Sequence, residues 1–179
     1  MGKVTYRNTE KEIWFKSNKA NGYAWLSNFW PDVSPAAKRA VAPELESARA
    51  SFLVNGKEYK TVEHYFHSVK YVEDDAAAED IRVQPTALEA KKRNTYYRHL
   101  KPINLNTWKN RRIIAMKEGL RAKFTQNVAL RNALLSTEDK KLQEVPSRGG
   151  GFWEGGRGEN KLGILLMELR DELKDDQPA

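Results

Sequence analysis

Residues 51–61, "SFLVNGKEYKT", constrain the fold most strongly, because they carry a clear hairpin signal. Asn55-Gly56 is the dipeptide that two-residue hairpin turns prefer, and apolar residues lie on both sides of it. The sequence therefore predicts a small antiparallel sheet at this point. Another short strand is predicted earlier in the chain, at "EIWFKS".

Helical spacing begins directly after the hairpin. Val62, Phe66 and Val69 recur at the period of a helix, and Thr61 is a favourable N-cap. Pro85 is placed to open a later helix. Further helices are predicted at "DDAAAEDIR", "PTALEAKKRN", "LNTWKNRRIIAMKEGLRAKF", "VALRNALLST" and "KLGILLMELRDELK". The pattern as a whole predicts an α+β protein that is mainly helical.

The length of the chain fits one hydrophobic core. At 179 residues, a second independent core is not expected, so we predict a single domain over residues 1–179 with a frayed tail at 174–179. Hydrophobic residues make up 40% and charged residues 31%, which is typical of soluble folded proteins. The chain has no cysteine, which excludes disulfides, thiolate nucleophiles and cysteine-bound metal centres.

The formal net charge of +7 is spread along the chain and favours anionic ligands. Phosphorylated small molecules and nucleic acids both satisfy this preference, and a solvated basic surface is the alternative. The first fifteen residues lack the apolar segment of a signal peptide, and no stretch is apolar for long enough to cross a bilayer. We expect a cytoplasmic protein with no membrane association and no obligate protein partner.

Three ionisable side chains share one stripe of the helix that follows the hairpin. Glu63, His67 and Lys70 lie next to the apolar stripe rather than opposite it, at the edge of a buried region. This arrangement is consistent with a functional site. The alternative is that Glu63, in the first turn, only complements the helix dipole.

The same segment resembles a metal-binding cluster superficially. In the zincin helix the two histidines are four residues apart with the glutamate between them, whereas His64 and His67 are three apart and Glu63 precedes both. The only other histidine is His99. We therefore predict no metal site and no cofactor.

Two further stretches combine residues that can hold a ligand. "GYAWLSNFW" presents Asn28 and Phe29 among large rings, which either stack on a planar base or fill the core under the loop. "SRGGGFWEGGRGENKLG" offers backbone donors, Arg148 and Arg157, and a helix that begins near Asn160, the ingredients of a phosphate cradle. It matches neither a P-loop nor a Rossmann fingerprint, and a flexible loop is the alternative.

Taken in order, the separated stretches resemble one known family. "WLSNFWP", "NGKEYKTVEHYFHSVKY", "WKNRRIIAM", "FWEGG" and "NKLGILLMELRDEL" are similar to motifs of the YbiA-like family, also called NADAR, over residues 25–173. The resemblance implies a mainly helical α+β domain that hydrolyses N-glycosidic bonds of ribose. It further implies that the substrate is a phosphorylated ribosyl small molecule, such as a riboflavin-pathway intermediate, or an ADP-ribosylated nucleic acid modified on guanine.

The resemblance also assigns roles to individual residues. Glu63 matches the functional carboxylate of the family and Trp108 its functional tryptophan, while Asn28 and Asn160 match polar residues that bind the ligand. The ligand-binding residues predicted in all are Asn28, Phe29, His67, Trp153, Gly156, Arg157 and Asn160.

The chain departs from the family pattern at two positions. The family usually has Gln where this chain has His67, and some members carry Gly-Asp-Gly after the tryptophan where Glu154, Gly155 and Gly156 follow Trp153. We predict that Glu154 replaces the aspartate as a second functional carboxylate. An exposed loop glutamate without a partner is the alternative.

The predicted chemistry agrees with these residues. Breaking the bond between a base nitrogen and the anomeric carbon passes through an oxocarbenium-like state, which the Glu63 carboxylate can stabilise while it orients or deprotonates water. Trp108 can lie against a flat base or a developing cation. Two other functions remain open: a non-catalytic module that binds ADP-ribose or other NAD-derived ligands, and a nucleic-acid-binding protein that binds unmodified DNA or RNA in a salt-sensitive manner.

Overall fold

The computed structural model describes residues 6–147 and 150–176 and contains helices on both sides of a central helix, α3. The strands are β1 (Glu12–Phe15), β2 (Phe52–Val54), β3 (Lys57–Tyr59) and β4 (Lys141–Glu144). The helices are α1 (Pro35–Arg39), α2 (Pro43–Glu46), α3 (Val62–Ser68), α4 (Asp75–Arg82), α5 (Ala87–Leu100), α6 (Leu105–Thr125), α7 (Val128–Leu135) and α8 (Lys161–Asp175). Two short 3-10 helices, η1 (Ala24–Leu26) and η2 (Val69–Tyr71), complete the structure.

The predicted hairpin and the helix after it are confirmed. β2 and β3 pair antiparallel with Phe52 opposite Tyr59, and Asn55 and Gly56 both have positive φ, as a two-residue hairpin turn requires. Thr61 caps α3, because its side-chain oxygen accepts a hydrogen bond from the amide of His64. The fold class, mainly helical α+β with a small antiparallel sheet, is therefore confirmed.

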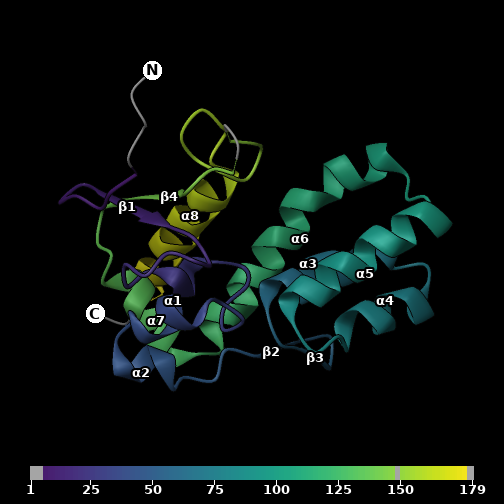
Figure 1. The fold of residues 1–179 in the computed structure, drawn as a ribbon, viewed down its shortest axis with the longest axis horizontal. Coiled ribbons are helices and arrows are strands. Elements are labelled where there is room, and N and C mark those ends of the chain that lie inside the picture. The colour runs from purple at the N-terminus through teal and green to yellow at the C-terminus, as the bar shows by residue number, and fades with distance from the viewer. Residues whose placement is uncertain (1–5, 148–149, 177–179) are drawn as a thin grey trace.

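A second sheet was not expected from the sequence. β1 was predicted, but its partner β4 lies about 130 residues away, and the two strands pair in parallel from Glu12 with Lys141 to Phe15 with Glu144. α8 packs directly on β4. In Figure 1 this layer lies on one side of α3 and α6, and α4 and α5 lie on the other side.

Two helix boundaries differ from the expectation. Pro85 does not open α5; it precedes the N-cap, Thr86, whose side chain accepts from the amide of Glu89. At the other end of the chain, α8 continues to Asp175, so residues 174 and 175 of the expected tail are helical. Residues 177–179 lie outside the described part of the chain.

The main core joins both layers through α3 and α6. Met116, Leu120 and Phe124 of the predicted apolar stripe of α6 are almost completely buried, and Ile113 packs against the same cluster. A smaller cluster lies between η2, α4 and α5 around Tyr71 and Ile81. Across residues 6–147 and 150–176, none of the helices combines the length and the apolar character needed to cross a bilayer.

The contact between α8 and β4 is close enough to demand glycine. A β-carbon added to Gly163 would lie 2.0 Å from the carbonyl oxygen of Leu142 and 2.6 Å from the side-chain oxygen of Asn160. Neither strand β4 nor the buried amide can move without disturbing the layer, so this position admits no side chain.

We predict that Gly163→Ala destabilises the protein by about 2 kcal/mol or more, because overpacking a close contact forces the backbone to shift. Denaturant unfolding followed by circular dichroism measures the change. Glu168→Ala on the same helix is the control, since Glu168 makes only a surface ion pair with Lys117. Equal stability of the two variants would contradict the close packing of α8 on β4.

Candidate functional site

Helix α3 is buried along its entire length, including its ionisable residues. All seven residues from Val62 to Ser68 are inaccessible or nearly so, because α4, α5 and α6 pack around the helix. Glu63 is only 7% exposed. A carboxylate at such a position is stable only if other groups compensate for the loss of water.

The compensation for Glu63 comes from its own helix and from α5. His67 Nε2 lies 2.9 Å from Glu63 Oε1, and Lys91 Nζ lies 3.7 Å from the same oxygen. Burial works to raise the pKa of Glu63, but the His67 ring and two nearby lysines lower it more strongly, so its pKa lies below its ordinary value. Glu63 is therefore an ionised carboxylate with one oxygen held in place.

Lys70 extends this contact into a chain of three side chains. Its Nζ lies 2.8 Å from His67 Nδ1. An ammonium group only donates, so Nδ1 accepts from Lys70 and Nε2 carries the proton that is donated to Glu63. Burial lowers the pKa of His67, which keeps the ring neutral, and burial also lowers the pKa of Lys70 from 10.5 to about 8. The predicted stripe Glu63, His67 and Lys70 is thus one connected network.

His64 takes no part in this network. Its Nδ1 lies 2.9 Å from Thr61 Oγ1 and its Nε2 lies 3.0 Å from the carbonyl oxygen of Gln84, so both ring nitrogens make structural contacts. The apparent cluster of Glu63, His64 and His67 therefore does not converge. In the part of the chain that the structure describes, no three His, Asp or Glu side chains are arranged to hold a metal ion.

An aromatic cluster brings the two predicted tryptophans together. The Phe66 ring lies 5.1 Å from the ring of Trp108 and 5.5 Å from the ring of Trp153, with both pairs tilted toward edge-on contact. Lys70 Nζ lies 5.2 Å from the centre of the Trp108 ring. Both tryptophans are only partly buried, so their rings are available to a planar ligand.

The loop that carries Asn28 and Phe29 is fixed against α3. The backbone oxygen of Asn28 accepts from the amide of Glu63 at 3.1 Å. The side-chain amide of Asn28 donates to the sulfur of Met116 at 3.4 Å, and its Oδ1 is buried with no hydrogen-bond partner among the described residues. Lys91 Nζ lies 5.5 Å from the centre of the Phe29 ring. Asn28 therefore contacts Glu63 directly, and Phe29 lies beside the lysine that pairs with Glu63.

Glu154 is not the exposed loop glutamate that the alternative required. Its Oε1 accepts a hydrogen bond from the amide of Ser147 at 3.0 Å and lies 3.9 Å from Lys16 Nζ. Lys16 also donates to Ser147 Oγ at 2.6 Å. The carboxylate is thereby tied to the segment that follows β4.

The glycine-rich segment differs from the cradle expected at the start of α8. The amides directly before α8 and at its start already donate to carbonyl oxygens, including Asn160 to Glu154 at 2.8 Å and Lys161 to Phe152 at 3.1 Å. Asn160 has positive φ, and its side chain donates to Leu142 O of β4 at 2.9 Å, so its visible role is structural. These amides are not free to bind a phosphate.

Gly156 and Arg157 lie away from Glu63. They line a cleft together with Tyr6, Arg7, Thr9, Glu12, Trp14, Lys141 and Gln143. This cleft is on the Gln143 side of β4, and Glu63 is not among its lining residues. Arg148, the other predicted cradle residue, lies outside the described residues.

Three functional candidates did not come from the sequence. Lys91 and Lys16 approach the two predicted carboxylates from α5 and from the end of β1, and nothing in their local sequence distinguishes them from other surface lysines. Glu144, the last residue of β4, is partly buried near both carboxylates. Burial and the charges of Glu154 and Glu63 raise the pKa of Glu144 to about 7.

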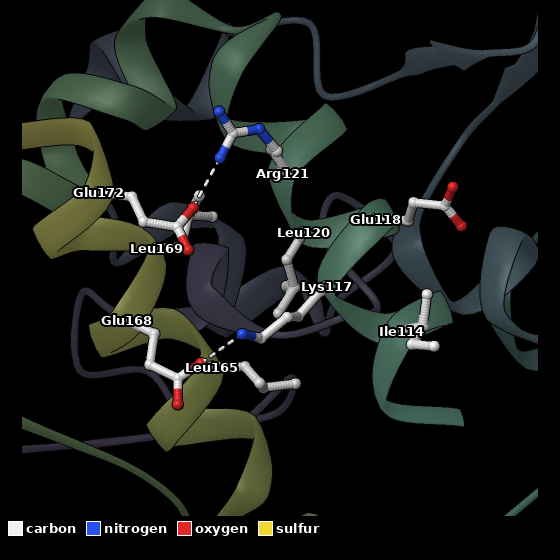
Figure 2. Close-up of a pocket in the computed structure, with 9 residues that line it drawn as sticks. All are labelled: Ile114, Lys117, Glu118, Leu120, Arg121, Leu165, Glu168, Leu169 and Glu172. Atoms are coloured by element: carbon white, nitrogen blue, oxygen red, sulfur yellow. Dashed lines mark hydrogen bonds and ion pairs between the residues drawn. The ribbon is translucent and has the colours of Figure 1, made fainter. Parts of the chain in front are cut away.

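A groove between α6 and α8 lacks comparable chemistry. Figure 2 shows Lys117 and Arg121 of α6 reaching Glu168 and Glu172 of α8 over an apolar floor of leucines. The two ion pairs measure 2.7 and 2.6 Å. Because these charged groups are already paired across the groove, they are poor candidates for catalysis.

Comparison with known proteins places this chain in a family. The family model for the NADAR domain matches residues 14–174. N-glycosidase YbiA of Escherichia coli is 37% identical over 122 residues, which cover 67% of this chain and 74% of that protein. A riboflavin biosynthesis protein of Vibrio vulnificus is 29% identical over 174 residues, 94% of this chain and 40% of that protein.

The fold agrees with a solved structure as well. The solution structure of Escherichia coli YbiA superimposes with a TM-score of 0.72 at 30% identity, covering 98% of this chain and 94% of that one. The match extends over the layer formed by β1, β4 and α8 and over the helices around α3, since it covers nearly the whole chain. With the family model, this shows that the chain belongs to the NADAR domain family.

Proposed function

We propose that the protein is an N-glycosidase that hydrolyses the N-glycosidic bond of a phosphorylated ribosyl compound. The observation that carries this proposal is the buried, ionised Glu63 carboxylate, which His67 and Lys70 connect to the aromatic cluster of Phe66, Trp108 and Trp153. The name of the YbiA relatives, N-glycosidase, supports the same reaction.

The geometry around Glu63 suits an oxocarbenium-like transition state. His67 donates a hydrogen bond to Oε1 of Glu63, and Lys91 forms an ion pair with the same oxygen. No described residue makes a hydrogen bond or ion pair with Oε2. Cleavage develops positive charge on the ribose ring, which an adjacent carboxylate stabilises most strongly where water is excluded. Glu63 then orients the attacking water or accepts its proton.

Two substrate classes fit this chemistry: a riboflavin-biosynthesis intermediate and ADP-ribosylated guanine in DNA. Relatives named as riboflavin biosynthesis proteins in Vibrio vulnificus and in Zea mays chloroplasts favour the small molecule. A product assay that compares a ribosylaminopyrimidine phosphate with ADP-ribosylated DNA tests the choice. Binding of either ligand without release of free base would support the alternative, a non-catalytic module for ADP-ribose or NAD-derived ligands.

We predict that Glu63→Gln lowers turnover by about a hundredfold or more, the usual effect of removing a positioned acid–base group. The amide still accepts from His67, so the fold should persist. Turnover and the melting temperature are measured together, with Glu46→Gln on the exposed surface of α2 as the control. A variant that keeps its rate but melts several degrees lower would show that Glu63 serves the helix dipole alone.

The His67 position tests whether the network around Glu63 matters for the rate. His67→Gln retains a donor toward Glu63, whereas His67→Leu leaves Oε1 without its hydrogen bond. We predict a rate loss of less than about tenfold for His67→Gln and a much larger loss for His67→Leu. Steady-state kinetics on one substrate distinguishes them. Equal losses would show that ring packing, rather than the donated hydrogen bond, is what the site needs.

Arg157 is a candidate contact for a substrate phosphate remote from the scissile bond, because its cleft lies on the Gln143 side of β4 and contains two other cations, Arg7 and Lys141. Arg157→Ala should raise KM more than it lowers kcat on a phosphorylated substrate, since the charge interacts equally with ground state and transition state. Arg39→Ala on α1, also exposed, is the matched control. Unchanged kinetics would remove this cleft from the substrate-binding surface.

A further inference from the structure

We propose that Glu144 is a catalytic residue that donates the proton taken up by the leaving nitrogen when the N-glycosidic bond breaks. The inference rests on the proposed N-glycosidase function and adds the acid that this function lacks. A neutral ribosylated amine or base is a poor leaving group, so its departure needs a proton at the nitrogen as well as a carboxylate at the ribose.

The position of Glu144 follows from the strand on which it lies. Side chains alternate along a strand, so Glu144 shares its face with Leu142, which is buried in the main core, and not with Gln143. Gln143 points to the opposite face, where its side-chain amide donates to Glu12. Glu144 therefore emerges from β4 on the face of the main core, to which α3 contributes Val62 and Phe66.

The backbone at Glu144 is held on both sides. The carbonyl oxygen of Glu144 accepts from the amide of Gly155 at 2.8 Å, and the next amide, of Val145, donates to Phe15 O of β1 at 2.8 Å. A β-carbon on Gly155 would lie 3.2 Å from the carbonyl oxygen of Glu144, so the glycine-rich segment fits closely here. These contacts fix the origin of the side chain between β1 and the segment that carries Glu154.

The three carboxylates differ in the groups that surround them. Glu63 is held by His67 and Lys91, and Glu154 by Ser147 and Lys16. The carboxyl group of Glu144 makes no ion pair or hydrogen bond with any residue among 6–147 and 150–176. Apart from burial, the negative charges of Glu154 and Glu63 act on it more strongly than the positive charges of Lys16 and Lys91.

Such an environment separates the roles of neighbouring carboxyl groups. Burial and the neighbouring negative charges raise the pKa of Glu144 to about 7. Its carboxyl group therefore stays protonated at a pH at which Glu63 is already ionised. One carboxyl group can then act as the acid while the other stabilises positive charge. Asn28, whose backbone oxygen contacts Glu63, also carries a buried side-chain oxygen without a hydrogen-bond partner among the described residues.

The step balances as a hydrolysis. The bond between C1′ and nitrogen breaks, its electron pair stays on nitrogen, and nitrogen takes the proton of Glu144. Water adds to C1′ and loses a proton to the carboxylate of Glu63. Transfer of that proton through solvent returns Glu144 to its acid form, so one water is consumed and neither carboxylate is changed.

Leaving-group dependence tests the proposal. The two probes are a ribosylaminopyrimidine 5′-phosphate, whose nitrogen must be protonated, and 4-nitrophenyl riboside 5′-phosphate, whose phenolate leaves unaided. Glu144→Gln should lose about a hundredfold or more on the first probe and less than about fivefold on the second. Glu63→Gln should lose rate on both, and Glu159→Gln, an exposed change in the same loop, on neither.

The pH profile provides a second readout. Turnover of the aminopyrimidine probe by the parent should fall as pH rises through about 7, and this limb should be absent in Glu144→Gln. Lys70→Met should keep the limb, which excludes the nearby lysine as its source. Because folding raises the pKa of Glu144 from 4.5 to about 7, ionisation in this range favours the unfolded state, so the parent should lose thermal stability between pH 4.5 and about 7 relative to Glu144→Gln.

The outcomes separate the two claims. If the parent hydrolyses neither probe, the proposed function fails. If the parent hydrolyses both and Glu144→Gln slows them equally or not at all, the function stands and the role of Glu144 is overturned. Selective loss on the aminopyrimidine probe, together with loss of the pH limb, supports Glu144 as the acid.

Discussion

The burial of the Glu63 carboxylate is the constraint on which the rest of the structure depends. Removing a carboxylate from water costs several kcal/mol unless hydrogen bonds and opposite charge compensate. Here the compensation comes from His67 on the same helix and from Lys91 on α5, and Lys70 orients His67 in turn. The arrangement of α3 and α5 thus determines the protonation state of the residue that we propose as the catalytic carboxylate.

The loop containing Asn28 is positioned by a second buried charge. Lys123 of α6 is 1% exposed, and its Nζ donates to the carbonyl oxygens of Trp25 and Ser27 at 2.6 and 3.0 Å. Burial lowers the pKa of Lys123 to about 7. Because these donors hold the loop against α6, Asn28 meets the first turn of α3. The hydrogen bonds that compensate for the burial of the Lys123 amine therefore also fix the backbone of Asn28 against Glu63.

The site is assembled from segments that are distant in the sequence. Phe66 contacts Trp108 of α6 and Trp153 of the glycine-rich segment, while Glu144 and Glu154 approach from β4 and its following loop. The parallel pairing of β1 with β4 makes this possible, since it fixes the end of β4 beside Lys16. The long separation between these strands explains why no local pattern indicated the pairing.

The sequence by itself determined the hairpin at Asn55-Gly56, helix α3 with its cap at Thr61, and the stripe containing Glu63 and His67. These features depend on turn chemistry and on side-chain periodicity, which are local properties. Only the tertiary structure decided that His64 turns away to Gln84, that the amides before α8 are already bonded, and that Glu144 lies near Glu63 and Glu154. Each of these depends on which groups meet across the fold, because burial and neighbouring charge, rather than residue type, set the pKa of a carboxyl group.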